Sequence, residues 1–168
     1  MELRLLNELP PDMFADIYNY LECINLSTKQ NKSSRRGFLP HKAEVFGITR
    51  QRYTGKVALS KASLKYPEIY QELIDLGNKI CPFDFNAIHI NHNVICPPHK
   101  DDKNVGDSLI VSFGDYTGAK LMVEGVEADT DCRPVIFNGN QLEHWNTDDL
   151  VGNKYSLVFY KSPYSVKN

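Results

Sequence analysis

The chain of 168 residues lacks an apolar run long enough to cross a membrane, and its start, MELRLLNELPPDMF, lacks the pattern of a signal peptide. No membrane partner is therefore expected. Its four cysteines are scattered, without a CxxC pair. This disfavours a cysteine zinc site and a disulfide framework, and it predicts free thiols in a reducing intracellular compartment, cytoplasm or nucleus. Internal repeats and low-complexity tracts are also absent, and the length predicts one domain over residues 1–168.

The formal net charge of −2 conceals an uneven distribution along the chain. Residues 29–65 contain ten basic residues against the single acidic Glu44, a net charge of +9, whereas the remainder is acidic. A basic block on an acidic body predicts contact with a polyanion such as nucleic acid. The alternative is a solvated loop whose lysines keep it in solution.

The first half of the chain predicts two helices. Residues 10–24 and 66–80 carry apolar side chains at helical spacing after an initial proline. Between them, residues 27–43 are polar, basic and broken by glycine and proline, which predicts a loop, and residues 44–53 predict a strand.

Short apolar runs separated by turns follow residue 84. They read FNAIHINHN, SLIVSFGDY, AKLMVEG, RPVIFNG and KYSLVFYKS. Helices followed by such strands predict an α+β fold. Its core would be a double-stranded β-helix, the cupin-like jelly roll, over residues 85–162, with residues 1–84 providing helical support and a basic substrate-side segment.

Two histidines and an aspartate suggest a metal site. His99 and Asp101 are two residues apart in CPPHKDDKN, so an extended backbone turns both side chains to one face, and His144 follows in QLEHWNTDD. Two imidazoles and one carboxylate can hold Fe(II) and leave three positions open, as in non-haem iron oxygenases. A zinc hydrolase could use similar ligands, and an HxD triplet alone could be a simple loop pair.

A second pair of residues makes the pattern more specific. Lys154 and Ser156 in GNKYSLVFY follow the second histidine and share one face of a predicted strand. The lysine can pair with a carboxylate, and the serine hydroxyl can donate to it. The two histidines of the segment NAIHINHN, His89 and His92, are separated by an odd number and cannot both be ligands from one strand.

This order of HxD, distal histidine and basic-x-Ser resembles the Fe(II)- and 2-oxoglutarate-dependent dioxygenases, over roughly residues 85–162. HKDDKNVGDSLIVSFGDYTGAKLMVEG, NGNQLEHW and GNKYSLVFY resemble more narrowly the small members of the TET/JBP branch, which oxidises the methyl group of pyrimidine bases in DNA. The resemblance implies Fe(II), 2-oxoglutarate and O2 as the reactive set. It also implies that His99, Asp101 and His144 are the iron ligands. Lys154 and Ser156 would contact the cosubstrate, and Asn104 would contact the target base.

The resemblance has two further consequences. The segment NHN resembles the strand before the triad in AlkB-like dioxygenases, which makes Asn91 and Asn93 candidate cosubstrate contacts; a strand-end turn is the alternative. The family usually has arginine where this chain has Lys154, so a point charge replaces a planar bidentate fork. Arg133, the nearby arginine of the β region, precedes a different strand.

The basic block indicates what the substrate is. Its cations alternate with Phe38, His41, Phe46 and Tyr53, which could stack on bases, and the candidate phosphate contacts are Lys32, Arg35 and Arg36. DNA carrying 5-methylcytosine or thymine is the predicted substrate. A protein hydroxylase acting on proline or another side chain, and a non-catalytic jelly-roll binding module, are the alternatives. DNA or RNA, the extent of oxidation and the oligomeric state stay open.

Overall fold

The computed structural model describes residues 2–29, 41–102 and 104–164. Its elements begin with β1 (Leu3–Leu5), the 3-10 turn η1 (Pro11–Phe14), α1 (Ala15–Glu22), β2 (Ser27–Lys29), β3 (His41–Arg50), β4 (Val57–Leu59), α2 (Lys61–Lys65) and α3 (Pro67–Ile80). The strands that follow are β5 (Ala87–His92), β6 (Ser108–Thr117), β7 (Leu121–Val123), β8 (Val126–Ala128), β9 (Val135–Phe137), β10 (His144–Asn146) and β11 (Val151–Tyr160). In the described part of the chain, no helix is long and apolar enough to cross a membrane.

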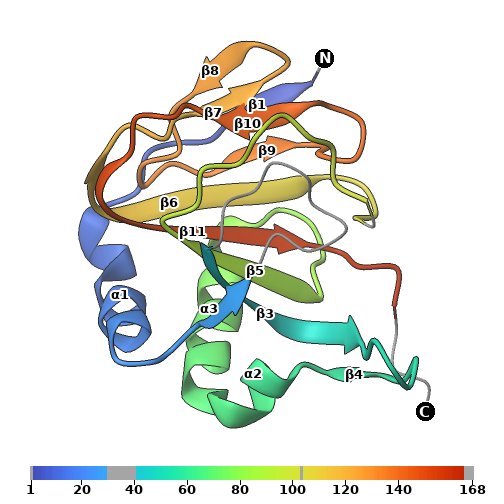
Figure 1. Ribbon diagram of the computed structural model, residues 1–168. Helices are drawn as coiled ribbons and strands as arrows, with labels where there is room; N and C mark the ends of the chain where they lie inside the picture. The colour runs from blue at the N-terminus through green and yellow to red at the C-terminus, as the bar shows by residue number, and fades with distance from the viewer. Residues whose placement is uncertain (1, 30–40, 103, 165–168) are drawn as a thin grey trace.

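The strands form two antiparallel sheets that make up a jelly roll (Figure 1). The large sheet has the order β1-β9-β6-β11-β5-β3-β2, with β4 paired to β3, and the small sheet has the order β10-β7-β8. A single antiparallel bridge between His99 and His144 extends the small sheet. The predicted α+β fold with a double-stranded β-helix core is therefore confirmed.

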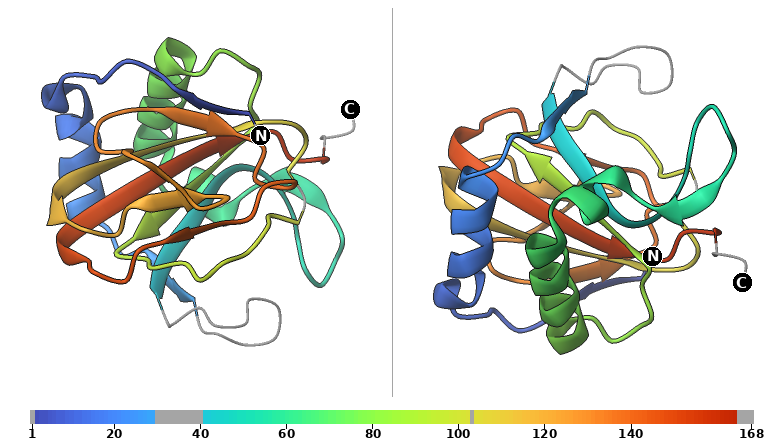
Figure 2. Two further views of the ribbon diagram at one scale, coloured as in Figure 1. Left: turned by 90° about the horizontal axis from the view of Figure 1, so that it is seen from above. Right: turned by 90° about the horizontal axis from the view of Figure 1, so that it is seen from below.

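The two faces of the large sheet have different roles. On β11, Tyr155, Leu157 and Phe159 pack with residues of α1 and α3, whereas Ser156 and Val158 between them line a cavity on the opposite face. This is the period-two alternation of a strand that is covered on both sides. The helices lie together against the outer face of the large sheet, as the view from below shows (Figure 2).

The packing of α3 depends on one glycine. A Cβ atom at Gly77 would meet the ring of Phe85 and lie 2.7 Å from that of Phe159, so only glycine lets the helix approach the sheet this closely. Both predicted helices are present within a few residues of their expected bounds, with the first turn of the N-terminal one wound as a 3-10 helix.

The predicted loop over residues 27–43 is wrong at both of its ends. Ser27–Lys29 form β2, and β3 begins at His41, three residues before the predicted strand; residues 30–40 lie outside the described residues. Polar residues pair here because β2 is the edge strand of the sheet, where one side faces water and apolar alternation is not required. The short elements β1, β4, β8, β10 and α2 have too few residues for a periodic pattern.

Candidate metal centre and adjoining cavity

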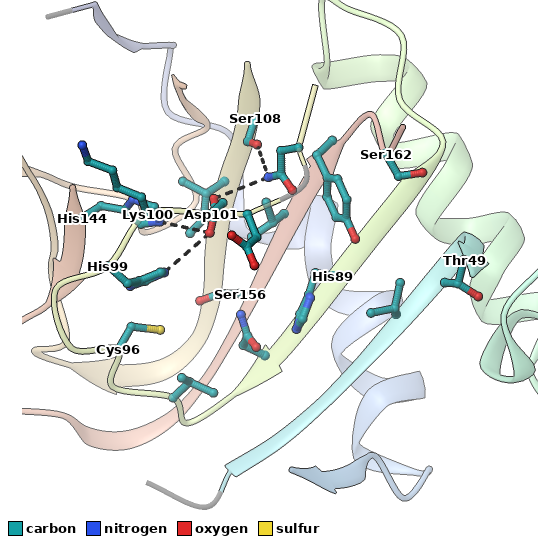
Figure 3. Close-up of a pocket in the computed structure, with 18 of the residues that line it drawn as sticks. Thr49, His89, Cys96, His99, Lys100, Asp101, Ser108, His144, Ser156 and Ser162 are labelled. Carbon is teal, nitrogen blue, oxygen red and sulfur yellow. Dashed lines mark hydrogen bonds and ion pairs between the residues drawn. The ribbon is translucent and has the colours of Figure 1, made fainter. Parts of the chain in front are cut away.

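Three side chains converge where the small sheet meets the segment after β5. One ligand atom from each of His99, Asp101 and His144 lies within 4.8 Å of the other two (Figure 3). Asp101 Oδ1 is 3.6 Å from His99 Nε2 and 3.5 Å from His144 Nε2. Two backbone hydrogen bonds between the histidines, of 3.0 and 2.9 Å, fix the distance between their strands. The structure thus brings together the three residues predicted as iron ligands.

The protonation pattern of both imidazoles suits a metal. His99 Nδ1 donates to the Pro97 carbonyl at 2.8 Å, and His144 Nδ1 donates to the Leu142 carbonyl at 2.9 Å. A carbonyl oxygen can only accept, so each neutral ring carries its proton on Nδ1 and presents the lone pair of Nε2 toward Asp101. Metal-ligating histidines are usually oriented by such a second hydrogen bond. The donor set therefore fits Fe(II), with mixed nitrogen and oxygen ligation.

Asp101 is held as a carboxylate. Burial alone would raise its pKa, but the interactions with His144 and His99 outweigh burial and hold the pKa well below its ordinary value. Burial would also lower the pKa of His144, but the protonated ring can donate a hydrogen bond from Nε2 to Asp101, which overcomes the effect of burial and raises the pKa. Asn104 Nδ2 lies 3.4 Å from Asp101 Oδ2 and donates to Ser108 Oγ at 3.0 Å. Asn104, predicted to touch a base, thus contacts the carboxylate while also lining the cavity.

One residue of this site was missed from the sequence. Gly139 accepts a backbone hydrogen bond from Asp101 at 2.8 Å, and a Cβ atom there would meet Asp101 Oδ2 and lie 3.1 Å from His144 Cε1. Only glycine leaves room for the carboxylate at this position. The sequence signal was the turn NGN after a predicted strand, which is common in turns of any kind.

A cavity of about 850 Å³ adjoins the three side chains. Its polar wall comes from strands far apart in the sequence, with Asn91 on β5, Cys96 after it, Asn146 on β10 and Ser156 on β11. Figure 3 shows the candidate ligands on one side of the cavity and Thr49 of β3 on the other. The cavity is thus large enough for a small acid together with a second reacting group.

Lys154 lies behind this wall, outside the cavity lining. It is 3% exposed, its Nζ donates to the Ala119 carbonyl at 2.7 Å, and it lies 5.3 Å from the centre of the Tyr116 ring. Burial lowers its pKa to about 8, although the charges of Cys96 and Asp131 act in the opposite direction. Within the described part of the chain it forms no ion pair, so Asp131 acts on this buried cation only through its charge, without direct contact.

A short chain of hydroxyl groups lies beside Lys154. Thr130 Oγ1 donates to Ser112 Oγ at 3.1 Å, and Ser112 Oγ lies 2.9 Å from Ser156 Oγ. Ser112 and Thr130 are buried, and Ser156 reaches the cavity. These hydrogen-bonded hydroxyl groups hold the Ser156 side chain at the wall of the cavity, on the same face of the strand as Lys154.

The remaining predicted contacts separate into two groups. Asn91 lines the cavity, but Asn93 leaves the strand at a φ of 53°, and its Oδ1 accepts from the Lys154 backbone N–H at 2.7 Å. Asn93 thus forms the strand-end turn that was the alternative for this segment, because period-two alternation stops where β5 ends. Lys32, Arg35 and Arg36 lie outside the described residues.

The aromatic residues of the basic block also differ from one another. Phe46 is fully buried and packs on Tyr70 of α3, so it cannot stack on a base as predicted, whereas Tyr53 is 93% exposed. Phe38 lies outside the described residues. As the alternation rule predicted, His89 lines the cavity while His92 faces the helices and stacks on Tyr155.

No protein-family model and no curated protein match the sequence. Among solved structures, NgTET1 in complex with 5mC DNA superposes with a TM-score of 0.65 at 15% identity, over 96% of this chain and 72% of that one. A Pseudomonas putida prolyl-4-hydroxylase gives 0.55 at 13% identity, over 96% and 93%. An oxidoreductase of the 2OG-Fe(II) oxygenase family from Burkholderia pseudomallei gives 0.54 at 15% identity, over 99% and 87%. At these identities, the similarity shows that the chain has the fold of these proteins.

Proposed function

We propose that this protein is an Fe(II)- and 2-oxoglutarate-dependent dioxygenase that hydroxylates a C–H bond, acting as a single domain over residues 1–168. The observation that carries the proposal is the convergence of two Nε2 lone pairs and one carboxylate at the edge of the cavity. A zinc hydrolase would use similar ligands, but it would not explain a buried cation near the same cavity.

The residues of the chain divide the task between them. His99, Asp101 and His144 would hold the iron on one face, while Asn104 and Gly139 position the carboxylate. Iron and 2-oxoglutarate, when bound, supply the oxidation of the C–H bond by O2, with succinate and carbon dioxide as the other products. The protein orients the target bond and excludes water from the site.

Lys154 and Ser156 would bind the distal carboxylate of 2-oxoglutarate. A buried ammonium without an acidic partner is destabilising, and an incoming carboxylate supplies the missing charge. Lysine presents a point charge in place of the planar fork of arginine, so Ser156 and its hydroxyl chain would supply the directional contact. Asn91, Cys96 and Asn146 would line the path between this anchor and the metal.

The substrate we propose is the methyl group of a pyrimidine base, 5-methylcytosine or thymine, in DNA. Three features support this: the net charge of +9 over residues 29–65, the position of Arg50 and Arg52 at the cavity, and the likeness to a protein solved with 5mC DNA. A base must leave the duplex to reach a buried metal, and phosphate contacts beside the cavity would hold the flanking backbone.

The test is incubation of DNA duplexes containing 5-methylcytosine or thymine with protein, Fe(II), 2-oxoglutarate and ascorbate, followed by mass spectrometry of the nucleosides. We expect hydroxymethylated bases and stoichiometric succinate, both absent with Asp101→Ala. Succinate release that is stimulated by a proline-containing peptide and not by DNA would indicate that the substrate is a protein. Absence of Fe(II) and 2-oxoglutarate binding would instead indicate a non-catalytic binding module.

A further inference from the structure

The loop between β3 and β4 combines an exposed aromatic ring with a cluster of cations. Residues 51–56 join the two strands, and they project from the body of the fold in both views of Figure 2. Tyr53 in this loop is 93% exposed, whereas Tyr20, the other strongly exposed aromatic of the described residues, is 42% exposed. The structure thus keeps one large ring almost entirely in water.

The loop is ordered by its own hydrogen bonds. Gln51 N–H donates to the Lys56 carbonyl at 2.8 Å, and Gly55 N–H donates to the Gln51 carbonyl at 2.9 Å. Thr54 Oγ1 also donates to Gln51 Oε1 at 2.8 Å. Gly55 has a φ of 69°, which favours glycine and closes the turn. A rigid loop loses little conformational entropy when it binds, so Tyr53 is presented in advance to a partner.

The charges of the loop, and of Arg50 at the end of β3 beside it, are all positive. Arg50, Arg52 and Lys56 are exposed, and none of them forms an ion pair with a described acidic residue. The Arg52 guanidinium lies 5.8 Å from the centre of the Tyr53 ring. Such a surface repels other cations and attracts a polyanion, and a planar cation beside an aromatic ring is suited to a phosphate flanking a stacked base.

The loop also belongs to the wall of the cavity. Arg50, Gln51 and Arg52 line the same cavity as His99 and Asp101. A base that turns into this cavity leaves a gap in the stack of its duplex, and an exposed aromatic ring nearby can fill that gap. Tyr53 directly follows Arg52, which lines the cavity, so this loop suits a duplex with one base turned out.

We propose that the β3–β4 hairpin tip, residues 50–56, is the finger by which this protein holds DNA. Tyr53 stacks in the gap beside the target nucleotide, and Arg50, Arg52 and Lys56 contact the neighbouring phosphates. The inference rests on the proposed function, because it names the substrate contacts of that same site. The tip would thus contribute to the affinity for DNA and would also unstack the duplex next to the target base.

The experiment uses metal-free protein, so that binding is measured apart from chemistry. A fluorescein-labelled duplex with one 5-methylcytosine reports affinity by anisotropy, and 2-aminopurine next to the target base reports unstacking by its fluorescence. The variants are Tyr53→Ala, Tyr53→Phe and Arg52→Ala. The matched controls are Tyr20→Ala on α1 and Lys79→Ala on α3, both of which remove exposed side chains from the helical face.

Tyr53→Ala should weaken binding by about 5- to 150-fold and abolish the 2-aminopurine signal, because one base loses its stacking partner. Tyr53→Phe keeps the ring and should restore both readouts. Arg52→Ala should reduce the slope of log affinity against log salt by about 0.9, the effect of one lost phosphate contact. The controls should bind as the wild type does.

Two results would refute the proposal that the β3–β4 hairpin tip holds DNA through Tyr53. If Tyr53→Ala binds and unstacks the duplex as the wild type does, while the wild type oxidises 5-methylcytosine, the finger is refuted and the proposed function stands. If the wild type binds no DNA duplex, or binds RNA alone, the finger is refuted together with DNA as the substrate.

Discussion

Replacing Lys154 with methionine tests the central electrostatic argument. The ammonium of Lys154 is 3% exposed and has no carboxylate partner among the described residues, so its charge is costly in the free protein. Methionine has similar length and no charge, and it fits irregular apolar space well. The variant should therefore fold, while losing the cation that we assign to the distal carboxylate of 2-oxoglutarate.

The magnitude follows from the shift in pKa. Burial lowers the pKa of Lys154 from 10.5 to about 8, and such a shift corresponds to about 3 kcal/mol at 1.36 kcal/mol per unit. Because the folded-state value lies below the unfolded one, the cost is fully present below pH 8 and disappears above pH 10.5. The free energy of unfolding of the wild type should thus rise, relative to that of Lys154→Met, by about 3 kcal/mol across this window.

The variant also loses the hydrogen bond from Nζ to the Ala119 carbonyl, worth about 1.5 to 3 kcal/mol for a charged donor. This loss offsets the relief of the buried charge, so at neutral pH Lys154→Met should be nearly as stable as the wild type or more stable.

The assay is urea unfolding of both proteins below pH 8 and at pH 10.5, with Lys79→Met as the control for removal of an exposed lysine. Parallel curves of stability against pH for wild type and Lys154→Met would refute the buried, unpaired cation. A thermal shift with 2-oxoglutarate and Mn(II) adds the functional readout, since the cosubstrate should stabilise the wild type and not the variant. Equal stabilisation of both would remove Lys154 from the cosubstrate site.

Three further predictions concern the metal centre. Asp101→Ala should abolish Mn(II) binding in calorimetry without changing the circular dichroism spectrum, and retained stoichiometric binding would contradict the ligand assignment. Gly139→Ala should destabilise the protein by about 1 to 3 kcal/mol and weaken metal binding, because the added methyl displaces Asp101 and crowds His144. An unchanged affinity for Mn(II) would show that the Asp101 carboxylate can still reach the metal with the methyl group present. Asn104→Ala should weaken metal binding by about 10- to 100-fold through loss of its contact with the carboxylate, with the exposed Asn78→Ala as control. An effect on DNA binding alone would return Asn104 to the base contact first expected of it.

The local pattern of apolar residues was sufficient to predict most of the long helices and strands of this fold. The apolar periodicity of α1 and α3 and the runs of β5, β6 and β11 are repeated over enough residues to be read from sequence alone. The edge strand β2 and the short strands β1, β4, β8 and β10 could not be read in this way. Their backbone groups pair because a neighbouring strand is already in place, and their own side chains carry little of that information.

The candidate site shows the same division. The period-two rule placed His89 and His92 on opposite faces and Lys154 and Ser156 on one face, and the structure agrees for His89 and His92. It could not place Asn93, because alternation applies only while the strand continues, and β5 ends at His92.

The sequence by itself determined which chemistry the chain can offer: two imidazoles, one carboxylate, one lysine-serine pair and an excess of cations in residues 29–65. Residue type fixes which donor, acceptor and metal-ligating atoms a side chain carries, and these do not depend on the fold. Only the tertiary structure decided that the three candidate ligands meet within 4.8 Å and that Gly139 makes room for them. It also decided that Lys154 is buried outside the lining of the cavity and that Tyr53 is exposed next to Arg52, which lines that cavity. These are distances between strands far apart in the sequence, and they exist only once both sheets have paired and packed.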